Sequence, residues 1–340
     1  MKPSYLCWRA RANPSIPQIP TRNATQPTMK HAPALLLTIL CAVPGLASAN
    51  EELTVLLDWF VNPDHAPLIV AQEKGFFADQ GLSVELVAPA DPSAPPKLVA
   101  AGQAFIAVSY QPQLHIQVAK GLPLTRFATL VATPLNALVV LAGSPIRSIA
   151  DLDGRKVGFS VGGFEDALLS AMLSQAGLSL DSITLINVNF SLSPSLISGQ
   201  VDAVIGAFRN FELNQMDIAG KPGRAFYVEE HGVPAYDELI LVARRDSVDD
   251  PKLAAFLQAL EAGVQFLVNH PKESWALFIK DRPELDDELN RRAWRDTLPR
   301  FALRPAALDK GRYDRFSRFL AEQGLIDEAL PADAYAVALD

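Results

Sequence analysis

The sequence predicts an α/β protein with two lobes, a two-strand hinge between them, and a cleft where the lobes face each other. Two observations lead to this prediction. Apolar strand patterns alternate with helical patterns in two separate series, each of about 90 to 100 residues. Two further strand patterns, at 136–146 and 236–246, join these series, and we expect them to form the hinge.

The first series begins directly after residue 51. Its expected elements, in chain order, are a strand at 52–58, a helix at 65–75, the strand LSVELVA, a helix in PSAPPKLVAAG, the strand AFIAVS and the helix QPQLHIQVAKG. Pro67 is compatible with the first helix because a first-turn N–H has no helical partner, and Gly75 provides the stop. Alternating strands and helices imply parallel strands with helices on the sheet faces.

The second series has the same alternation. Its expected elements are a strand at 156–160, a helix at 164–175, the strand ITLINVN, the short helix LSPSLISG and the strand VDAVIGAF. From Pro251 onward the pattern is helical, with four expected helices. We therefore expect residues 50–140 and 240–340 in lobe 1, and residues 141–239 in lobe 2.

The first 49 residues differ from the rest, because they contain five Lys or Arg and no acid. Lys30 precedes an apolar run that extends through Val43 and is followed by Ala-Ser-Ala, a pattern typical of a secretory signal peptide. We expect a signal peptide at 29–49, cleavage after Ala49 and a soluble protein in the periplasm. The alternative is a buried N-terminal helix. Residues 1–28 fit a signal poorly, and we interpret them as a non-native or mis-started extension.

Cleavage after Ala49 would remove Cys7 and Cys41, which are the two cysteines of the chain. The remaining 291 residues carry 25 basic and 38 acidic side chains, a net charge of −13. A chain without cysteine forms no disulfide and offers no thiolate to a metal. Its acidic balance argues against a nucleic-acid partner.

Polar and aromatic side chains follow several of the expected strands. Ligands of open α/β sheets bind beyond the carboxyl ends of the strands, so both lobes can contribute to one cleft and bury a ligand on closure. The candidate ligand-binding residues are Asp58, Trp59, Asn62, His65, Ser109, Tyr110, Gly162, Phe164, Phe208 and Glu212.

Most of these candidates have a structural alternative. Trp59 is either a core residue or a flat surface for a flat ligand, and Glu212 is either a solvated helix residue or a carboxylate that faces the ligand. Gly162 either lets a backbone approach the ligand or belongs to an ordinary turn. For His65 we favour a capping or positioning role over metal binding. Glu165 fits the general preference for acids in a first helical turn, so we do not assign it to the site.

Catalytic patterns are scarce. The sequence has no His or Cys pair at metal-binding spacing, no G-x-S-x-G elbow and no phosphate-binding glycine loop. We therefore expect no catalytic residue, no metal and no cofactor.

The segment LLDWFVNPDHAPLIVAQEKGFFADQGLSVELVAPADP carries a family resemblance, together with KLVAAGQAFIAVS, SIADLDGRKVGF, ISGQVDAVIGAF and DELILVARRD. From residue 52 to about residue 325 the chain resembles a superfamily that contains substrate-binding proteins of ABC importers for thiamine pyrimidine precursors, and also the fungal thiamine pyrimidine synthase. The resemblance implies the type II periplasmic-binding-protein-like fold. It also implies an aminopyrimidine ligand, such as formylaminopyrimidine or hydroxymethylpyrimidine.

The resemblance implies roles for the candidate residues. Trp59 would stack on the ring, with Phe164 or Phe208 as an aromatic of the other lobe. Glu212 or Asp58 would accept hydrogen bonds from the exocyclic amine. Asn62, His65 and Tyr110 would complete the contacts at the ring edge.

The chain departs from the synthase at the residues that perform its chemistry. Where the synthase has a lysine for pyridoxal phosphate and a histidine four residues later, this sequence has Ser109 and Gln113. The cysteine cluster of the synthase is also missing. Schiff-base chemistry needs the amine, so the resemblance implies a binding protein rather than an enzyme. Its expected partners are the ABC permease and ATPase subunits, with the binding protein itself a monomer.

Three alternatives remain open from the sequence. The ligand could be another small solute, such as riboflavin or a sulfonate. The protein could be a secreted enzyme of pyrimidine metabolism. It could also be a sensor domain that acts on a separate membrane receptor.

Overall fold

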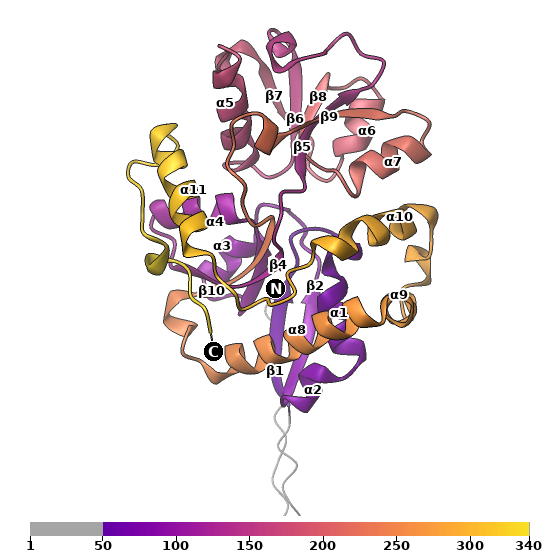
Figure 1. Ribbon diagram of the computed structural model, residues 1–340, viewed down its shortest axis with the longest axis vertical. Helices are drawn as coiled ribbons and strands as arrows, with labels where there is room; N and C mark the ends of the chain where they lie inside the picture. The colour runs from indigo at the N-terminus through magenta and orange to yellow at the C-terminus, as the bar shows by residue number, and fades with distance from the viewer. Residues whose placement is uncertain (1–49, 340) are drawn as a thin grey trace, which may run out of the picture. The chain divides into compact units, whose positions relative to one another are not determined.

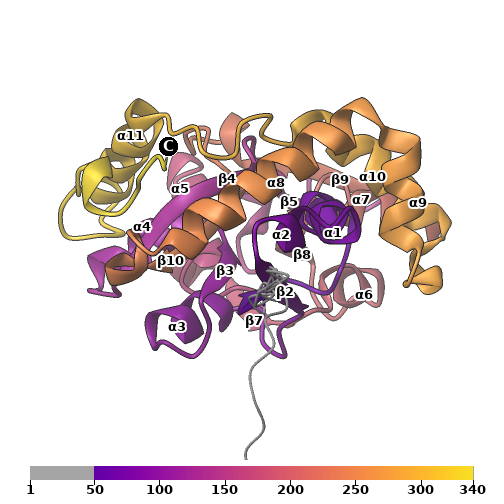
Figure 2. The same cartoon turned by 90° about the horizontal axis from the view of Figure 1, so that it is seen from below.

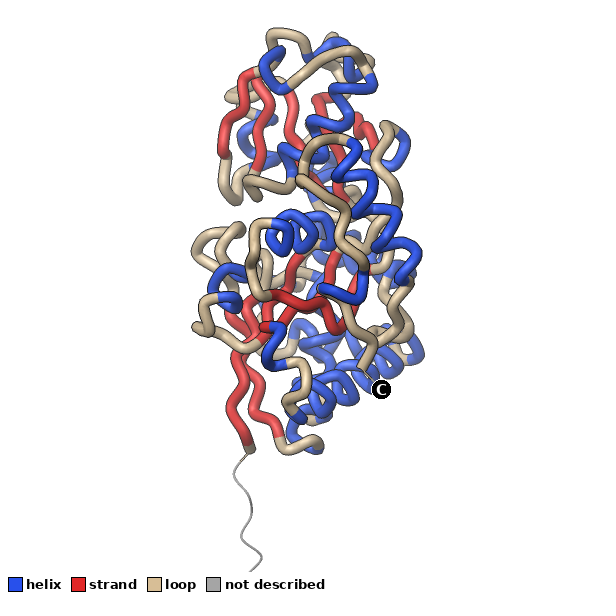
Figure 3. Tube along the Cα trace, turned by 90° about the vertical axis from the view of Figure 1, so that its left-hand side faces the viewer, coloured by secondary structure: helices blue, strands red, loops and turns tan. Residues whose placement is uncertain are grey.

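The computed structural model describes residues 50–339, which form two five-stranded sheets with helices around them (Figure 1). Figure 3 shows the strands gathered in two separate groups. The α/β class and the two-lobed arrangement that the sequence predicts are confirmed. The expected extension at 1–28 and signal peptide at 29–49 lie outside the described residues.

Sheet A forms the core of lobe 1, and its strand order is β2-β1-β3-β10-β4. The strands are β1 Glu51–Leu56, β2 Leu82–Val87, β3 Ile106–Ser109, β4 Leu124–Val131 and β10 Leu239–Arg244. β1 runs parallel to β2 and β3, as the alternating pattern predicts, whereas β10 runs antiparallel to β3 and β4. β10 is reversed because it enters sheet A from the other lobe. β4 was not predicted.

Sheet B forms the core of lobe 2, with the order β7-β6-β8-β5-β9. The strands are β5 Asn136–Leu141, β6 Lys156–Phe159, β7 Thr184–Asn187, β8 Ala203–Phe208 and β9 Gly223–Tyr227. β6 is parallel to β7 and β8, and β5 is antiparallel to β8 and β9. β9 was not predicted.

The chain passes between the sheets twice, at 132–135 and at 228–238. β5 belongs wholly to sheet B, so the first crossing lies a few residues before the boundary that we expected at residue 140. The Glu238 carboxylate joins the two crossings, because one of its oxygens accepts the backbone N–H groups of Leu135 and Asn136.

Helices cover the sheets in both lobes. Lobe 1 contains α1 Ala66–Glu73, α2 Phe76–Asp79, α3 Pro95–Ala100, α4 Gln111–Ala119, α8 Pro251–Asn269, α9 Pro271–Ile279, α10 Glu288–Thr297 and α11 Lys310–Glu322. Lobe 2 contains α5 Glu165–Gln175, α6 Leu192–Ile197 and α7 Glu212–Ile218. The four helices that the sequence predicts after Pro251 are α8 to α11.

The C-terminal helices pack on the N-terminal part of lobe 1. α8 lies against α1, as Figure 2 shows, and this contact depends on Gly263. A Cβ atom at Gly263 would lie 2.8 Å from both the Pro67 carbonyl oxygen and the Ala71 Cβ atom. The first α-helix of the described chain is thus fixed by a helix from the C-terminal part of the sequence. Within residues 50–339, none of the helices has the length and apolar character needed to cross a bilayer.

Candidate functional site

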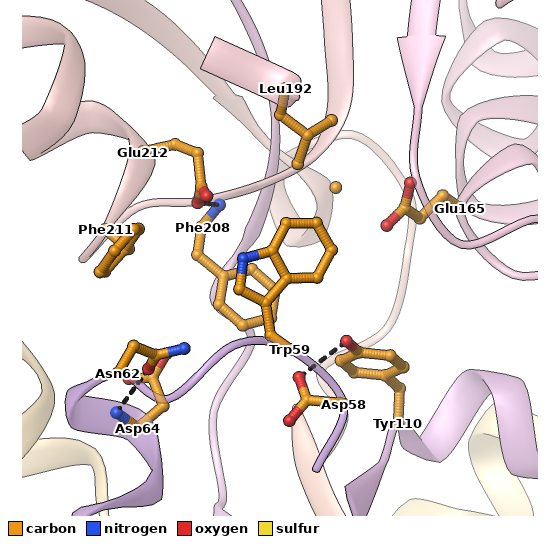
Figure 4. A pocket seen from close by; sticks show the side chains of 11 residues that line it. Asp58, Trp59, Asn62, Asp64, Tyr110, Glu165, Leu192, Phe208, Phe211 and Glu212 are labelled. Atoms are coloured by element: carbon orange, nitrogen blue, oxygen red, sulfur yellow. Dashed lines mark hydrogen bonds between the residues drawn. The ribbon is translucent and has the colours of Figure 1, made fainter. Parts of the chain in front are cut away.

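A cavity lies where the carboxyl ends of strands from both sheets meet (Figure 4). The non-atom space within it is about 380 Å³ and includes open solvent, whereas the volume that can hold the centres of water-sized molecules is about 30 Å³, so this conformation leaves little free room. Eleven residues line it: Asp58, Trp59, Asn62, Asp64, Tyr110, Glu165, Leu192, Gly206, Phe208, Phe211 and Glu212.

The loop after β1 carries Trp59 and is held by a buried hydrogen-bond network. Asn62 caps a short 3-10 helix by accepting the Asp64 N–H at 2.8 Å, and His65 Nδ1 accepts the Asn62 N–H at 3.3 Å. Because Nδ1 is an acceptor, the proton of the neutral ring lies on Nε2, which is 2.9 Å from Asp58 Oδ1. His65 is fully buried and does not line the cavity. It therefore positions the loop.

Two aromatic residues of lobe 2 contact Trp59 and Tyr110 of lobe 1. The Trp59 ring is partly buried and meets Phe190 edge-on, with ring centroids 4.6 Å apart. Tyr110 donates its hydroxyl to Asp58 Oδ2 at 2.8 Å, and its ring stacks on Phe164 at 4.8 Å. The face of Phe164 is thus occupied by Tyr110, whereas Phe208 lines the cavity together with Trp59.

Three carboxyl groups of the lining have raised pKa values. Burial raises the pKa of Glu165 and of Glu212 to about 8, and that of Asp64 to about 6. Glu165 accepts the Ser160 N–H and Glu212 accepts the Phe208 N–H, each at 2.7 Å. Both glutamates are therefore mostly uncharged at pH 7 and can donate a hydrogen bond as well as accept one.

Gly206 leaves the space that the Glu165 carboxyl group occupies. Its φ is +96°, and a Cβ atom there would lie 2.3 Å from Glu165 Oε1. Figure 4 shows the indole of Trp59 in the middle of the cavity, between Glu165 on one side and Glu212 on the other. The cavity thus combines an aromatic surface with carboxyl groups on both sides.

Six of the ten candidate residues line the cavity, namely Asp58, Trp59, Asn62, Tyr110, Phe208 and Glu212. The other four do not. His65 and Phe164 are buried behind it, the Ser109 hydroxyl donates to Gln113 Oε1 at 2.9 Å, and Gly162 is exposed on its turn. Whether the six bind a ligand stays a prediction.

Sequence reasoning missed five lining residues: Asp64, Glu165, Leu192, Gly206 and Phe211. Two of them had a signal in the sequence. Glu165 follows a glycine turn at a strand end, and we had attributed its position to the helix dipole alone. Asp64 lies in the same loop as the predicted Asn62. Leu192, Gly206 and Phe211 carry no pattern that distinguishes them from core residues.

The lining is acidic. Among the residues that the structure describes, it includes four carboxyl groups and no Lys, Arg or His. Such a cavity favours ligands that donate hydrogen bonds, and it offers an anion no basic side chain to compensate its charge. Residues 50–339 also contain no group of three or more His, Cys, Asp or Glu side chains that could hold a metal ion.

Comparison with known proteins places this arrangement in a family. A family model described as "NMT1/THI5 like" matches residues 62–274. The chain belongs to the NMT1/THI5-like family.

Proteins with several different names are similar in sequence to this NMT1/THI5-like chain. A Haemophilus influenzae protein named for thiamine biosynthesis is 53% identical over 90% of this chain and 98% of its own length. The formylaminopyrimidine-binding protein of Halalkalibacterium halodurans is 34% identical, covering 77% of this chain and 83% of its own. The 4-amino-5-hydroxymethyl-2-methylpyrimidine phosphate synthase of Uromyces fabae is 30% identical, covering 72% and 74%.

Solved structures identify the fold of this NMT1/THI5-like chain. The alkanesulfonate-binding protein of Xanthomonas axonopodis pv. citri, bound to MOPS, superposes with a TM-score of 0.67 at 15% identity, over 85% of this chain and 99% of the other. A Candida albicans protein with the generic periplasmic binding protein fold has a TM-score of 0.67 at 17% identity, over 86% and 97%. The chain therefore has the two-lobed periplasmic-binding-protein-like fold.

Proposed function

We propose that this protein is the solute-binding component of an ABC importer. In this proposal it is exported to the periplasm as a monomer, binds a thiamine pyrimidine precursor of the formylaminopyrimidine or hydroxymethylpyrimidine type, and delivers it to the permease and ATPase subunits. The names of the Haemophilus and Halalkalibacterium relatives support this proposal, as does the fold.

The observation that carries the proposal is the pairing of aromatic rings with buried, mostly uncharged carboxyl groups. A flat heterocycle stacks favourably on an indole, and Trp59 offers such a surface in the cavity. A protonated carboxyl group donates its O–H to a ring nitrogen and accepts an N–H from the neighbouring amine. Glu212 and Glu165 are in that protonation state at pH 7.

The same residues argue against an anionic ligand. A sulfonate would lie among four carboxyl groups, with no basic side chain among the described lining residues to compensate its charge.

The fungal relatives are synthases, so an enzymatic role is the second candidate. By the sequence resemblance, Ser109 and Gln113 would correspond to the synthase lysine and histidine, and these two side chains hydrogen-bond to each other. A serine hydroxyl does not form a Schiff base with pyridoxal phosphate. This supports binding without covalent chemistry.

Calorimetry and a turnover assay on formylaminopyrimidine test the proposal together. We expect tight binding without product, and no binding of an alkanesulfonate measured in parallel. Native mass spectrometry of the purified protein should show a co-purified aminopyrimidine. Product formation would favour the enzyme, whereas binding of the sulfonate in preference to the pyrimidine would contradict the proposal.

A further inference from the structure

Three buried polar side chains meet beside the cavity. Asn210 Nδ2 donates to Asp64 Oδ1 and to Thr297 Oγ1, each at 2.6 Å, and the Thr297 hydroxyl donates to Asp64 Oδ1 at 2.8 Å. None of the three side chains is more than 2% exposed. We call this group the Asp64–Asn210–Thr297 cluster.

The cluster joins the two lobes. Asn210 follows β8 of lobe 2, while Asp64 and Thr297 belong to lobe 1, the latter at the end of α10. α10 contacts both the 3-10 helix that contains Asp64 and α7 of lobe 2 (Figure 1). A second bridge lies beside the first, because Asn214 Nδ2 donates to Asp296 Oδ2 at 2.9 Å.

Asp64 has two roles in this arrangement. It lines the cavity, and its Oδ1 atom accepts a hydrogen bond from Asn210 of the other lobe. Burial raises the pKa of Asp64 to about 6, so at neutral pH the carboxyl group is mostly ionised. Hydrogen bonds to an ionised carboxylate are stronger than those between neutral groups. The hydrogen bond from Asn210 to Asp64 is therefore charge-assisted, and it lies at the wall of the cavity.

We infer that Asn210 is a positioning residue, which holds the lobes together through Asp64 and Thr297 and so sets how much of the ligand-free protein is closed. When the lobes separate, Asn210 loses both partners, while Asp64 and Thr297 keep each other. The apparent dissociation constant of a ligand that needs the closed form varies inversely with the closed fraction. This consequence for affinity rests on the proposed function, whereas the effect on closure does not.

The test measures closure in the absence of ligand. The full-length chain, with Cys7→Ser and Cys41→Ser, is labelled for energy transfer at Ser174→Cys on α5 and Glu322→Cys on α11, two exposed positions in different lobes. In this background Asn210→Ala is compared with the parent. We expect the ratio of closed to open molecules to fall about tenfold, the effect of one hydrogen bond to a charged group.

Two further variants control the test. Asn269→Ala removes an exposed amide that donates to Gln265 within α8, so it should leave the ratio unchanged. Thr297→Val removes the hydroxyl but preserves the shape, and it should lower the ratio even if Asn210→Ala fails to fold. Equal energy-transfer distributions for the parent and both cluster variants would overturn the inference.

Binding of formylaminopyrimidine separates this inference from the proposed function. If the proposed function and the inference both hold, Asn210→Ala weakens binding by the factor by which the closed fraction falls, up to about tenfold, mainly through faster release. Opening of the ligand-free variant without any pyrimidine binding by the parent would uphold the cluster and reject the ligand. If closure of the variant is unchanged and the parent binds the pyrimidine tightly, the proposed ligand is upheld and the role of the cluster is rejected.

Discussion

At the scale of single residues, the position of Trp59 follows from its neighbours. Asp58 directly precedes it, and the Asp58 carboxyl group lies within hydrogen-bond distance of His65 and Tyr110. The backbone around the indole is thus fixed on both sides, while the ring remains partly exposed to the cavity. A ring held in this way loses little conformational freedom when a flat ligand stacks on it.

Removal of the indole should weaken ligand binding. We expect Trp59→Ala to raise the dissociation constant of an aminopyrimidine at least tenfold, because stacking contributes about 1 kcal/mol beyond the buried area. Trp59→Phe keeps an aromatic face, so its dissociation constant should rise less than that of Trp59→Ala. Calorimetry of the two variants measures both effects, and equal affinity of Trp59→Ala and the parent would remove Trp59 from the site.

Loss of the Tyr110 hydroxyl should affect stability. Tyr110→Phe leaves Asp58 Oδ2 without its buried donor at 2.8 Å, so we expect a loss of about 1–3 kcal/mol in the free energy of unfolding. Urea unfolding followed by circular dichroism measures this change. A variant as stable as the parent would show that water replaces the hydroxyl.

At the scale of elements, the sequence predicted most helices and the parallel strands, since their apolar periods are regular. It missed β4 and β9. β4 is buried along its whole length, so it lacks the alternation that marks a half-exposed strand, and it contains the charged Arg126. The antiparallel direction of β5 and β10 depends on where the chain crosses between the sheets, and local patterns do not contain that information.

The contact between α1 and α8 should be sensitive to a single methyl group. Gly263→Ala places a Cβ atom 2.8 Å from the Pro67 carbonyl oxygen, so we expect a loss of about 1–3 kcal/mol in the free energy of unfolding. Gly311→Ala in α11 is the matched control, because its nearest neighbour is the end of the Arg315 side chain. It should be neutral or stabilising by up to about 1 kcal/mol. If Gly263→Ala and Gly311→Ala change the thermal unfolding equally, the close packing of α8 on α1 would be contradicted.

At the scale of the whole molecule, the sequence predicted two lobes and a cleft, together with most of the lobe 1 residues that line the cavity. The lining residues of lobe 2 were mostly missed. Which side of a loop such as 160–165 faces the cavity depends on how the two lobes meet. The local sequence around Glu165 and Leu192 does not contain that information. Two independent series of strands and helices thus predict the architecture, but the site is defined only once the two lobes are packed against each other.

The buried carboxyl groups should make stability depend on pH. Burial raises the pKa values of Glu165 and Glu212 from the ordinary 4.5 to about 8, so the folded chain binds these protons more tightly than the unfolded chain. Their effect on stability is most favourable below about pH 4.5 and becomes less favourable as the pH rises towards 8. Glu238, with its pKa raised to about 7, acts in the same direction.

Replacing the two cavity glutamates should reduce this dependence. We expect Glu165→Gln/Glu212→Gln to lose less stability than the parent between pH 6 and pH 8.5, with a difference in melting temperature of about 3 °C or more. Glu230→Gln, at an exposed position, is the control and should follow the parent. Parallel curves for the double variant and the parent would show that the two glutamates titrate normally.

The order of the elements along the chain also determines the order in which the two lobes can fold during synthesis. Sheet B needs only the stretch from Asn136 to Tyr227, whereas sheet A waits for β10, and Thr297 follows later still on α10. In a chain that emerges from its N-terminus, lobe 2 is finished first, and Thr297, one of the two partners of Asn210, is added later. A polypeptide cut short before α10 would contain every strand of the described residues and Asp64, yet it would lack Thr297 and with it one of the two hydrogen-bond partners of Asn210.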